Sequence, residues 1–302
     1  MRRSVPILLA IFGLLAAACG GGGAGAPATK VSLTIASFNF AESQILAEIY
    51  GQALATDGHT VKYKHKLGNR EIVFPALEKG DINFVPEYLA TSLAFATKAT
   101  DKVGDPAKAL PSFRDALKPK GIAALEFASA IDTNAFVVTK ATAQKHNLRK
   151  MSDLTAVAKQ LTLGAPPECP QRPFCLQGLK SAYGIEFKEF KALDAGGPIT
   201  VAAVESGQVD VGLLFSTDAQ IAAKGFVLLE DDKKLQAADN VVPVVRQDVI
   251  DKGGATLTTR INDISKKITT EKLTALNGKV QIDKKDPADV AKEFLKAEGL
   301  IK

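Results

Sequence analysis

The spacing of apolar residues changes from a strand pattern to a helix pattern near the start of the chain. Between residues 31 and 37 apolar and polar residues alternate, as in a strand with one buried face. From Ala41 apolar residues recur at helical spacing until Asp57 and Gly58. The pattern then repeats, predicting strands at 60–66 and 82–85, a helix at 70–79 and a helix that opens at Pro86-Glu87 and carries Tyr88. This alternation predicts a mostly parallel sheet.

A second unit of the same design follows. Its predicted strands are 136–138, 161–164, 187–190 and 209–215, and its predicted helices are a short one near 152–154, then 178–183 and 198–206. After a strand at 241–245, two helices at 260–276 and 286–298 are expected to pack back on the first unit. The chain is therefore predicted to be an α/β protein with two lobes.

The N-terminus carries the pattern of an export signal. Arg2 and Arg3 precede an apolar run, Val5–Leu15, and three alanines then lead to Cys19. The run is too short for a membrane-spanning helix, which needs about 20 residues. Residues 1–18 are therefore predicted to be a signal peptide.

Cys19 and the glycine-rich segment after it resemble the lipobox and tether of a bacterial lipoprotein. Cys19 is then the expected lipidation site, and 19–29 is a tether to the extracytoplasmic face of the membrane. An ordinary signal peptide with an incidental cysteine is the alternative.

Composition narrows the class of protein. The chain is 46% hydrophobic and 24% charged, which is typical of globular proteins. Its formal net charge is +5, but no basic cluster is interleaved with aromatic residues, which argues against nucleic-acid binding. No Gly-x-Ser-x-Gly, His-Glu-x-x-His or P-loop motif is present, so we predict neither an enzyme nor a cofactor.

Cysteine usage agrees with export. Apart from Cys19, only Cys169 and Cys175 remain, and an oxidising compartment favours a disulfide between them. A closed loop of about seven residues contributes roughly 2.4 kcal/mol in the chain-entropy model. A zinc site is the alternative, but none of the three histidines lies near this segment in sequence.

Four short motifs resemble those of osmoprotectant-binding proteins of ABC transporters, the OpuAC-type glycine betaine/choline/carnitine group. They stand in the family's order within residues 31–300: Glu42-Ser43-Gln44-Ile45-Leu46-Ala47-Glu48, Leu67-Gly68-Asn69-Arg70-Glu71-Ile72-Val73, Pro86-Glu87-Tyr88-Leu89-Ala90-Thr91 and Phe215-Ser216-Thr217-Asp218-Ala219.

The resemblance implies a type II periplasmic-binding-protein fold with two α/β lobes and a ligand cleft between them. Lobe I would comprise 30–132 plus 241–302 and lobe II 133–240, joined by two hinge crossings near 129–136 and 237–244. The implied function is the extracytoplasmic, monomeric solute-binding component of an ABC importer. It would capture a small quaternary-ammonium or zwitterionic solute and deliver it to the permease and ATPase subunits.

Ligands of open α/β sheets bind beyond the carboxyl ends of strands, against helix N-termini. Aromatic faces suit a trimethylammonium group, and Arg, Lys or backbone N–H groups suit a carboxylate. The candidate ligand-binding residues are Phe38, Asn39, Phe40, Ser43, Asn69, Arg70, Tyr88, Asn134, Phe215, Thr217 and Asp218.

Each role has an alternative. Tyr88 and Phe215 are expected to bracket the ligand from opposite lobes, Arg70 to meet its anionic part and Asp218 its cationic part. The aromatic residues of lobe I would otherwise belong to the core, and Asp218 would cap a helix.

The ligand itself stays open. Many betaine binders carry a lysine near Phe38 and a tyrosine near 199–202, and this chain has neither. Another zwitterion, ergothioneine-like or an amino-acid derivative, and a ligand sensor without a transporter are the alternatives.

Overall fold

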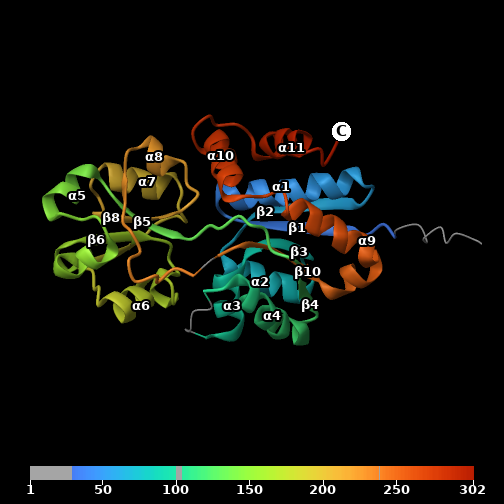
Figure 1. Cartoon of the computed structure of the whole chain (residues 1–302), viewed down its shortest axis with the longest axis horizontal. Helices are drawn as coiled ribbons and strands as arrows, with labels where there is room; N and C mark the ends of the chain where they lie inside the picture. The colour runs from blue at the N-terminus through green and yellow to red at the C-terminus, as the bar shows by residue number, and fades with distance from the viewer. Residues whose placement is uncertain (1–28, 100–103, 238) are drawn as a thin grey trace, which may run out of the picture.

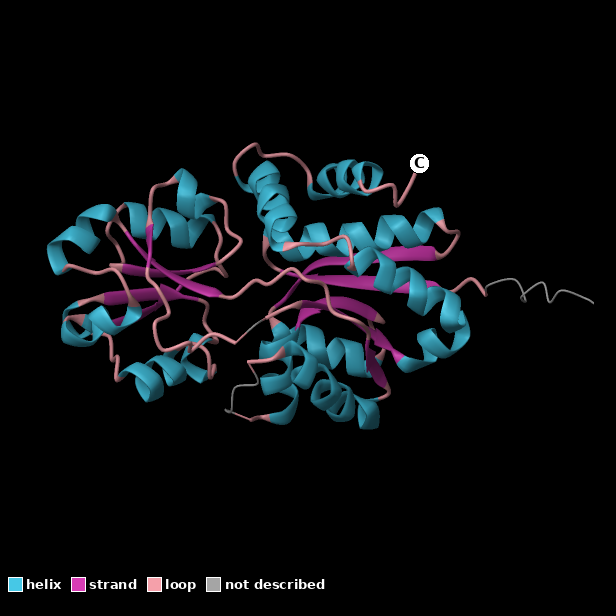
Figure 2. Ribbon diagram, in the orientation of Figure 1, coloured by secondary structure: helices cyan, strands magenta, loops and turns pink. Residues whose placement is uncertain are grey.

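The computed structural model describes residues 29–99, 104–237 and 239–302. The predicted signal peptide and Cys19 lie outside these residues. Two α/β lobes lie side by side, each built on a five-stranded sheet with helices on its faces (Figures 1 and 2). We call the part built on the first sheet lobe I and the part built on the second sheet lobe II.

The sheet of lobe I has the strand order β2-β1-β3-β10-β4. Its strands are β1 (Ser32–Phe38), β2 (Thr60–Gly68), β3 (Phe84–Tyr88), β4 (Ile122–Ala124) and β10 (Val241–Arg246). Its helices are α1 (Ala41–Thr56), α2 (Arg70–Lys79), α3 (Leu89–Thr97), α4 (Pro106–Leu117), α9 (Gln247–Ser265), α10 (Thr270–Gln281) and α11 (Pro287–Ala297).

The sheet of lobe II has the order β7-β6-β8-β5-β9. Its strands are β5 (Asn134–Val138), β6 (Thr162–Ala165), β7 (Glu189–Ala192), β8 (Val211–Phe215) and β9 (Val227–Leu228). Its helices are α5 (Lys140–His146), α6 (Leu176–Gly178), α7 (Pro198–Glu205) and α8 (Gln220–Ala223), with 3-10 turns at Met151–Ala156, Ala158–Gln160 and Cys169–Gln171 and a π-turn at Leu179–Tyr183.

Both sheets are mixed, but four of the five strands in each run in the same direction, so the prediction of a mostly parallel sheet is confirmed. In lobe I, β1 is parallel to β2 and β3, but β10 is antiparallel to β3 and β4. In lobe II, β5 is likewise antiparallel to β8 and β9. The reason is that β5 and β10 each begin where the chain has just crossed from the other lobe. They therefore run away from the cleft, whereas the strands of the strand–helix units run toward it.

The two crossings are hydrogen-bonded to each other. Ile131 and Asn240 form an antiparallel bridge, and the N–H of Asp132 donates to the carbonyl of Asp239 at 3.1 Å. These hydrogen-bonded residues fall within the segments 129–136 and 237–244.

The prediction of a helix opening at Pro86-Glu87 was wrong. Strand β3 continues through Tyr88, and Pro86 lies opposite Pro243 of β10. Proline is usually excluded from the interior of a sheet because it lacks an N–H. Here two prolines face each other, a pairing that involves residues far apart in sequence.

The C-terminal helices were only partly predicted. Helix α9 begins directly after β10 and continues across a kink at Gly254, whose φ of 63° is left-handed. The predicted helix at 260–276 is in fact the end of α9 and the start of α10, which Thr269 caps by accepting from the N–H of Lys272. As expected, α10 and α11 pack against α1 of lobe I (Figure 2).

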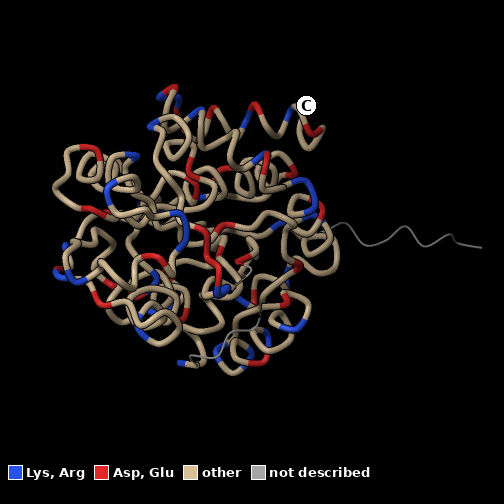
Figure 3. The backbone as a smooth tube through the Cα atoms, turned by 60° about the vertical axis from the view of Figure 1, so that its left-hand side comes forward, with Lys and Arg blue, Asp and Glu red and all other residues tan. Residues whose placement is uncertain are grey.

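Apolar residues form one core in lobe I, a main core with two smaller clusters in lobe II, and a small cluster between the lobes. That cluster joins Phe174 of lobe II to Ala90 and Ala94 of α3 in lobe I. Basic and acidic residues are interspersed along both lobes (Figure 3). Among the described residues, no helix combines the length and the apolar character that crossing a membrane requires.

Candidate functional site

A cavity of about 750 Å³ lies between the lobes. Lobe I contributes the ends of β1 and β3 and the start of α2, and lobe II contributes the end of β8, the start of β5 and the segment 166–175. This volume falls in the range of small-molecule sites. The cavity therefore lies beyond the carboxyl ends of the strands, as the sequence predicted.

Aromatic rings form one wall of this cavity. The ring of Phe40 lies 4.9 Å from that of Phe215 and 6.0 Å from that of Tyr88, measured between centroids, and stacks on Phe38 at 5.9 Å. All four line the cavity. Phe40 lies between Tyr88 and Phe215, so the aromatic contact between the lobes runs through Phe40.

Behind this wall, one buried carboxylate ties the lobes together. Glu42, in the first turn of α1, accepts hydrogen bonds from the hydroxyl of Tyr88 at 2.7 Å and from the amide of Asn277 at 2.6 Å. It also accepts from the hydroxyl of Thr217, which belongs to lobe II. We call Glu42, Tyr88, Thr217 and Asn277 the Glu42 network. Sequence reasoning missed Glu42, although an acidic residue at the start of a helix beside two aromatics was a usable signal.

Burial perturbs the carboxyl groups around the cleft. It raises the pKa of Glu42, against the opposing effect of its three donors. Burial also raises the pKa of Asp132 well above its ordinary value, and the negative charge of Glu42 adds to this. Burial raises the pKa of Asp239 and of Asp218 to about 6.

Arg70 lies at the cavity wall, but Glu87 already balances its charge. The guanidinium donates to Glu87 at 3.0 Å from Nε and 2.8 Å from Nη2, and to the hydroxyl of Thr91 at 3.0 Å. Glu87 is fully buried. A compensated guanidinium attracts an added anion weakly, and the role of Arg70 toward the anionic part of a ligand stays a prediction.

The structure places three other candidates outside the cavity. Ser43 lies in the interior, where its hydroxyl accepts from the N–H of Phe38 at 2.8 Å because the chain turns there into α1. Thr217 and Asp218 line a neighbouring cavity of about 320 Å³ instead. Asp218 precedes Ala219, the N-cap residue of α8, and accepts from the N–H of Gln220 at 3.2 Å.

The polar candidates Asn39, Asn69 and Asn134 do line the main cavity. The Asn69 amide donates to Glu168 at 3.3 Å, and its buried Oδ1 has no hydrogen-bond partner among the described residues. The Asn134 amide donates to the carbonyl of Phe174 at 3.0 Å.

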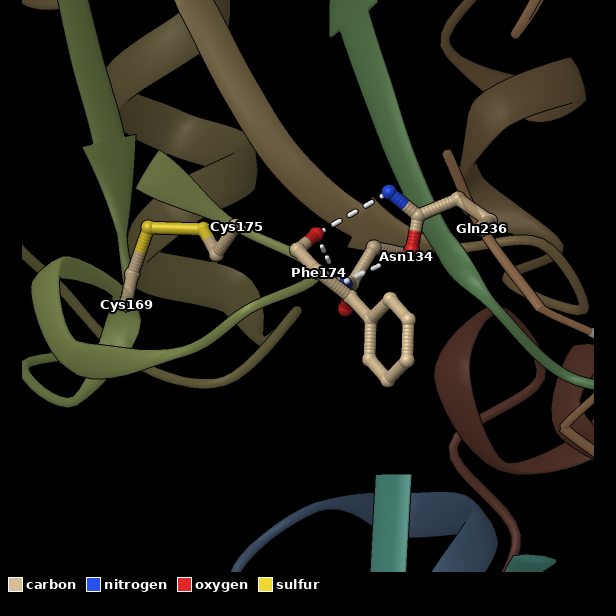
Figure 4. The surroundings of a disulfide bond; sticks show 5 residues. All are labelled: Asn134, Cys169, Phe174, Cys175 and Gln236. Carbon is tan, nitrogen blue, oxygen red and sulfur yellow. Dashed lines mark hydrogen bonds between the residues drawn. A yellow bond between two sulfur atoms is a disulfide. The ribbon is translucent and has the colours of Figure 1, made fainter. Parts of the chain in front are cut away.

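The segment 166–175 carries site residues that sequence reasoning did not assign. The predicted disulfide joins Cys169 to Cys175, and Phe174 lies in the loop that it closes (Figure 4). Arg172 donates to Glu71 of lobe I at 2.9 Å and lies 5.3 Å from the ring centroid of Phe95. Its buried Nε has no hydrogen-bond partner among the described residues, and burial lowers the pKa of the guanidinium. The signal that could have found Arg172 is a lone arginine inside a disulfide-closed, proline-rich loop.

The motifs and the cleft agree with comparisons to known proteins. A family model described as the substrate binding domain of ABC-type glycine betaine transport systems matches residues 31–297. The chain belongs to this family. The resemblance inferred from the four motifs is confirmed, and the family's proteins are extracytoplasmic solute-binding components of ABC transporters.

The relatives named below match this chain over nearly its whole length. The carnitine transport binding protein OpuCC of Listeria monocytogenes is 29% identical over 96% of this chain and 94% of its own length. A glycine-betaine-binding protein of Pseudomonas aeruginosa is 27% identical over 95% of this chain and 94% of its own. A solved structure of a glycine betaine/carnitine/choline ABC transporter protein is 30% identical, with a TM-score of 0.69, covering 89% of this chain and 100% of that one. The predicted two-lobed type II fold is therefore confirmed.

The buried carboxyl groups predict how stability depends on pH. The pKa of Asp218 is about 6 in the folded state against 3.8 ordinarily, so the folded state holds this proton where the unfolded chain has released it. Its contribution is present below about pH 4 and is lost as pH rises through 6. Between pH 5 and 7.5 we expect this one group to lower the free energy of unfolding by about 1.4 kcal/mol.

Urea unfolding of the wild type and of Asp218→Asn at pH 5 and pH 7.5 measures the contribution of Asp218 to the free energy of unfolding. Between these pH values the free energy of unfolding should fall less in the variant than in the wild type, by about 1.4 kcal/mol. Equal falls in the two proteins would mean that Asp218 does not titrate in this range.

Proposed function

We propose that this chain captures a small zwitterion with a quaternary ammonium group and a carboxylate, of the glycine betaine or carnitine type, for an ABC importer. The observation that carries the proposal is the pairing of two features in one cavity. An aromatic wall from both lobes stands in the same cavity as Arg172, whose Nε–H donor is unused among residues 29–99, 104–237 and 239–302.

The aromatic wall suits the ammonium end. A trimethylammonium group offers no N–H donor, and aromatic faces attract it by roughly 0.5–2 kcal/mol per ring. Phe40, Tyr88 and Phe215 supply such faces, and the carboxyl groups of Asp132 and Asp239 line the same cavity. Burial raises the pKa of both groups, and in its ionised form each adds to the attraction for a cation.

Arg172 suits the carboxylate end. Its Nη2 already pairs with Glu71, but its buried Nε–H has no acceptor in the part of the chain that the structure describes. A buried donor without an acceptor costs free energy, which a ligand carboxylate would remove. Arg70 is a weaker candidate because Glu87 occupies its donors.

The remaining parts of the proposal concern context. Four further parts of the proposal rest on the sequence. They are the signal peptide 1–18, the lipidation of Cys19 with its tether 19–29, a monomeric state, and the lobe boundaries 30–132 plus 241–302 for lobe I and 133–240 for lobe II. Permease and ATPase partners follow from the relatives' roles as transport binding proteins. Ligand contacts from both lobes would favour the closed arrangement, which such a transporter can recognise.

Isothermal titration calorimetry with a ligand panel tests the proposed function. The panel is glycine betaine, carnitine, ergothioneine, choline, proline and maltose. Glycine betaine or carnitine should bind most tightly, and at 100 times its Kd should raise the free energy of unfolding by about 2.7 kcal/mol. Tighter binding of maltose than of any charged solute would overturn the ligand class.

A further inference from the structure

The loop that Cys169 and Cys175 close is held in one conformation from within. Hydrogen bonds link the N–H of Cys169 to the carbonyl of Pro166 at 2.9 Å, and the N–H of Cys175 to the carbonyl of Arg172 at 3.1 Å. Both cysteines are 2% exposed and belong to the core of lobe II. The loop is therefore anchored at both ends while its middle, with Arg172, faces the cleft.

The segment 166–175, which contains this loop, reaches lobe I through three side chains. Glu168 accepts from Asn69 at 3.3 Å, and Arg172 pairs with Glu71 at 2.9 Å. Phe174, only 4% exposed, packs against Ala90 and Ala94 of α3. These contacts join the two lobes through residues that do not belong to the Glu42 network.

Phe174 is also tied to the segments that flank the hinge. Its carbonyl accepts from the amide of Asn134 at 3.0 Å and from that of Gln236 at 3.0 Å (Figure 4). Asn134 directly follows the first crossing and Gln236 shortly precedes the second. The position of the loop is therefore coupled to the crossings between the lobes.

We propose that the Cys169–Cys175 disulfide positions Arg172 for ligand recognition and Phe174 for lobe closure. This inference rests on the proposed function, because it assigns the bridge to the carboxylate end of the ligand. A loop that is already ordered loses less conformational freedom when ligand binds, so preorganisation increases affinity. The disulfide acts through Arg172 and is a positioning element.

The proposal predicts a selective effect that a purely stabilising disulfide would not produce. Cys169→Ser/Cys175→Ser should weaken binding of glycine betaine about tenfold. Choline has no carboxylate for Arg172 to meet, so its Kd should change less than about threefold. In an Arg172→Gln background, removing the disulfide should weaken glycine betaine no more than it weakens choline, less than about threefold, because only the contribution through Phe174 remains.

Calorimetry on the four proteins with both ligands tests this. Equal losses for glycine betaine and choline, or additive losses in the combined variant, would overturn the positioning role. Circular dichroism at the assay temperature confirms that each variant is folded.

A second measurement decides the point without any ligand. Amide hydrogen exchange of the unliganded protein should be faster in the double serine variant at residues 171–175 and at residues 90–94 of α3, and unchanged in the core strand β8. Unchanged exchange at residues 171–175 and at residues 90–94 would contradict the proposal. If the wild type binds no zwitterion, the proposed function fails, and this exchange result alone decides whether the disulfide positions the loop against lobe I.

Discussion

Arg172→Gln is expected to weaken binding of glycine betaine about 100-fold. The variant removes a charge-assisted hydrogen bond in a closed cleft, and hydrogen bonds to charged groups contribute about 1.5–3 kcal/mol. Arg172 also pairs with Glu71 and lies over Phe95, so the loss includes a contact between the lobes. Choline should lose much less affinity. Calorimetric titration with both ligands measures the difference.

Two controls sharpen this prediction. Arg149→Gln makes the same charge change at an exposed position of lobe II that does not line the cavity, and should leave both affinities unchanged. Arg172→Lys keeps the charge but not the planar donor geometry, and should give an intermediate loss. Unaltered binding of glycine betaine in Arg172→Gln would show that its carboxylate is held elsewhere.

Glu42→Ala is expected to lower the free energy of unfolding by about 3 kcal/mol. The substitution leaves three buried donors, from Tyr88, Thr217 and Asn277, without their acceptor. An unsatisfied buried donor costs about 1–3 kcal/mol, and the relief from burying one carboxylate offsets part of the sum. Because Thr217 belongs to lobe II, ligand affinity should fall as well, by roughly tenfold. Urea unfolding and calorimetry give the two values.

Glu48→Ala is the matched control for this variant. Glu48 is also a buried glutamate of α1, but its partners Gln52 and His65 both belong to lobe I. This variant should lose stability while keeping its affinity for ligand. If Glu42→Ala and Glu48→Ala behave alike, the Glu42 network does not help to close the cleft.

Local patterns predicted most of the first lobe. Helix α2 has the predicted bounds Arg70–Lys79, and α1 ends where Asp57 and Gly58 were expected to stop it. The errors lie where distant residues decide the structure. Pro86 stays in a strand because of its partner Pro243, and Gly254 bends α9 without ending it.

The sequence predicted where the candidate site lies better than it predicted what each residue does there. The aromatics were found because they follow strands, and the ends of parallel strands meet at one edge of a sheet. The roles of Arg70 and Asp218 depend on partners that the sequence does not bring together, such as Glu87 for Arg70. Arg172 was missed for the same reason, since its place opposite Glu71 arises only when the two lobes close.

A crystal structure of the protein with glycine betaine bound tests the central claim most directly. In that structure we expect the trimethylammonium group to lie within about 6 Å of the ring centroids of Phe40, Tyr88 and Phe215. We also expect the carboxylate to accept a hydrogen bond from Nε of Arg172. Glycine betaine bound outside the cleft between the lobes, or bound there with its carboxylate away from Arg172, would contradict the account.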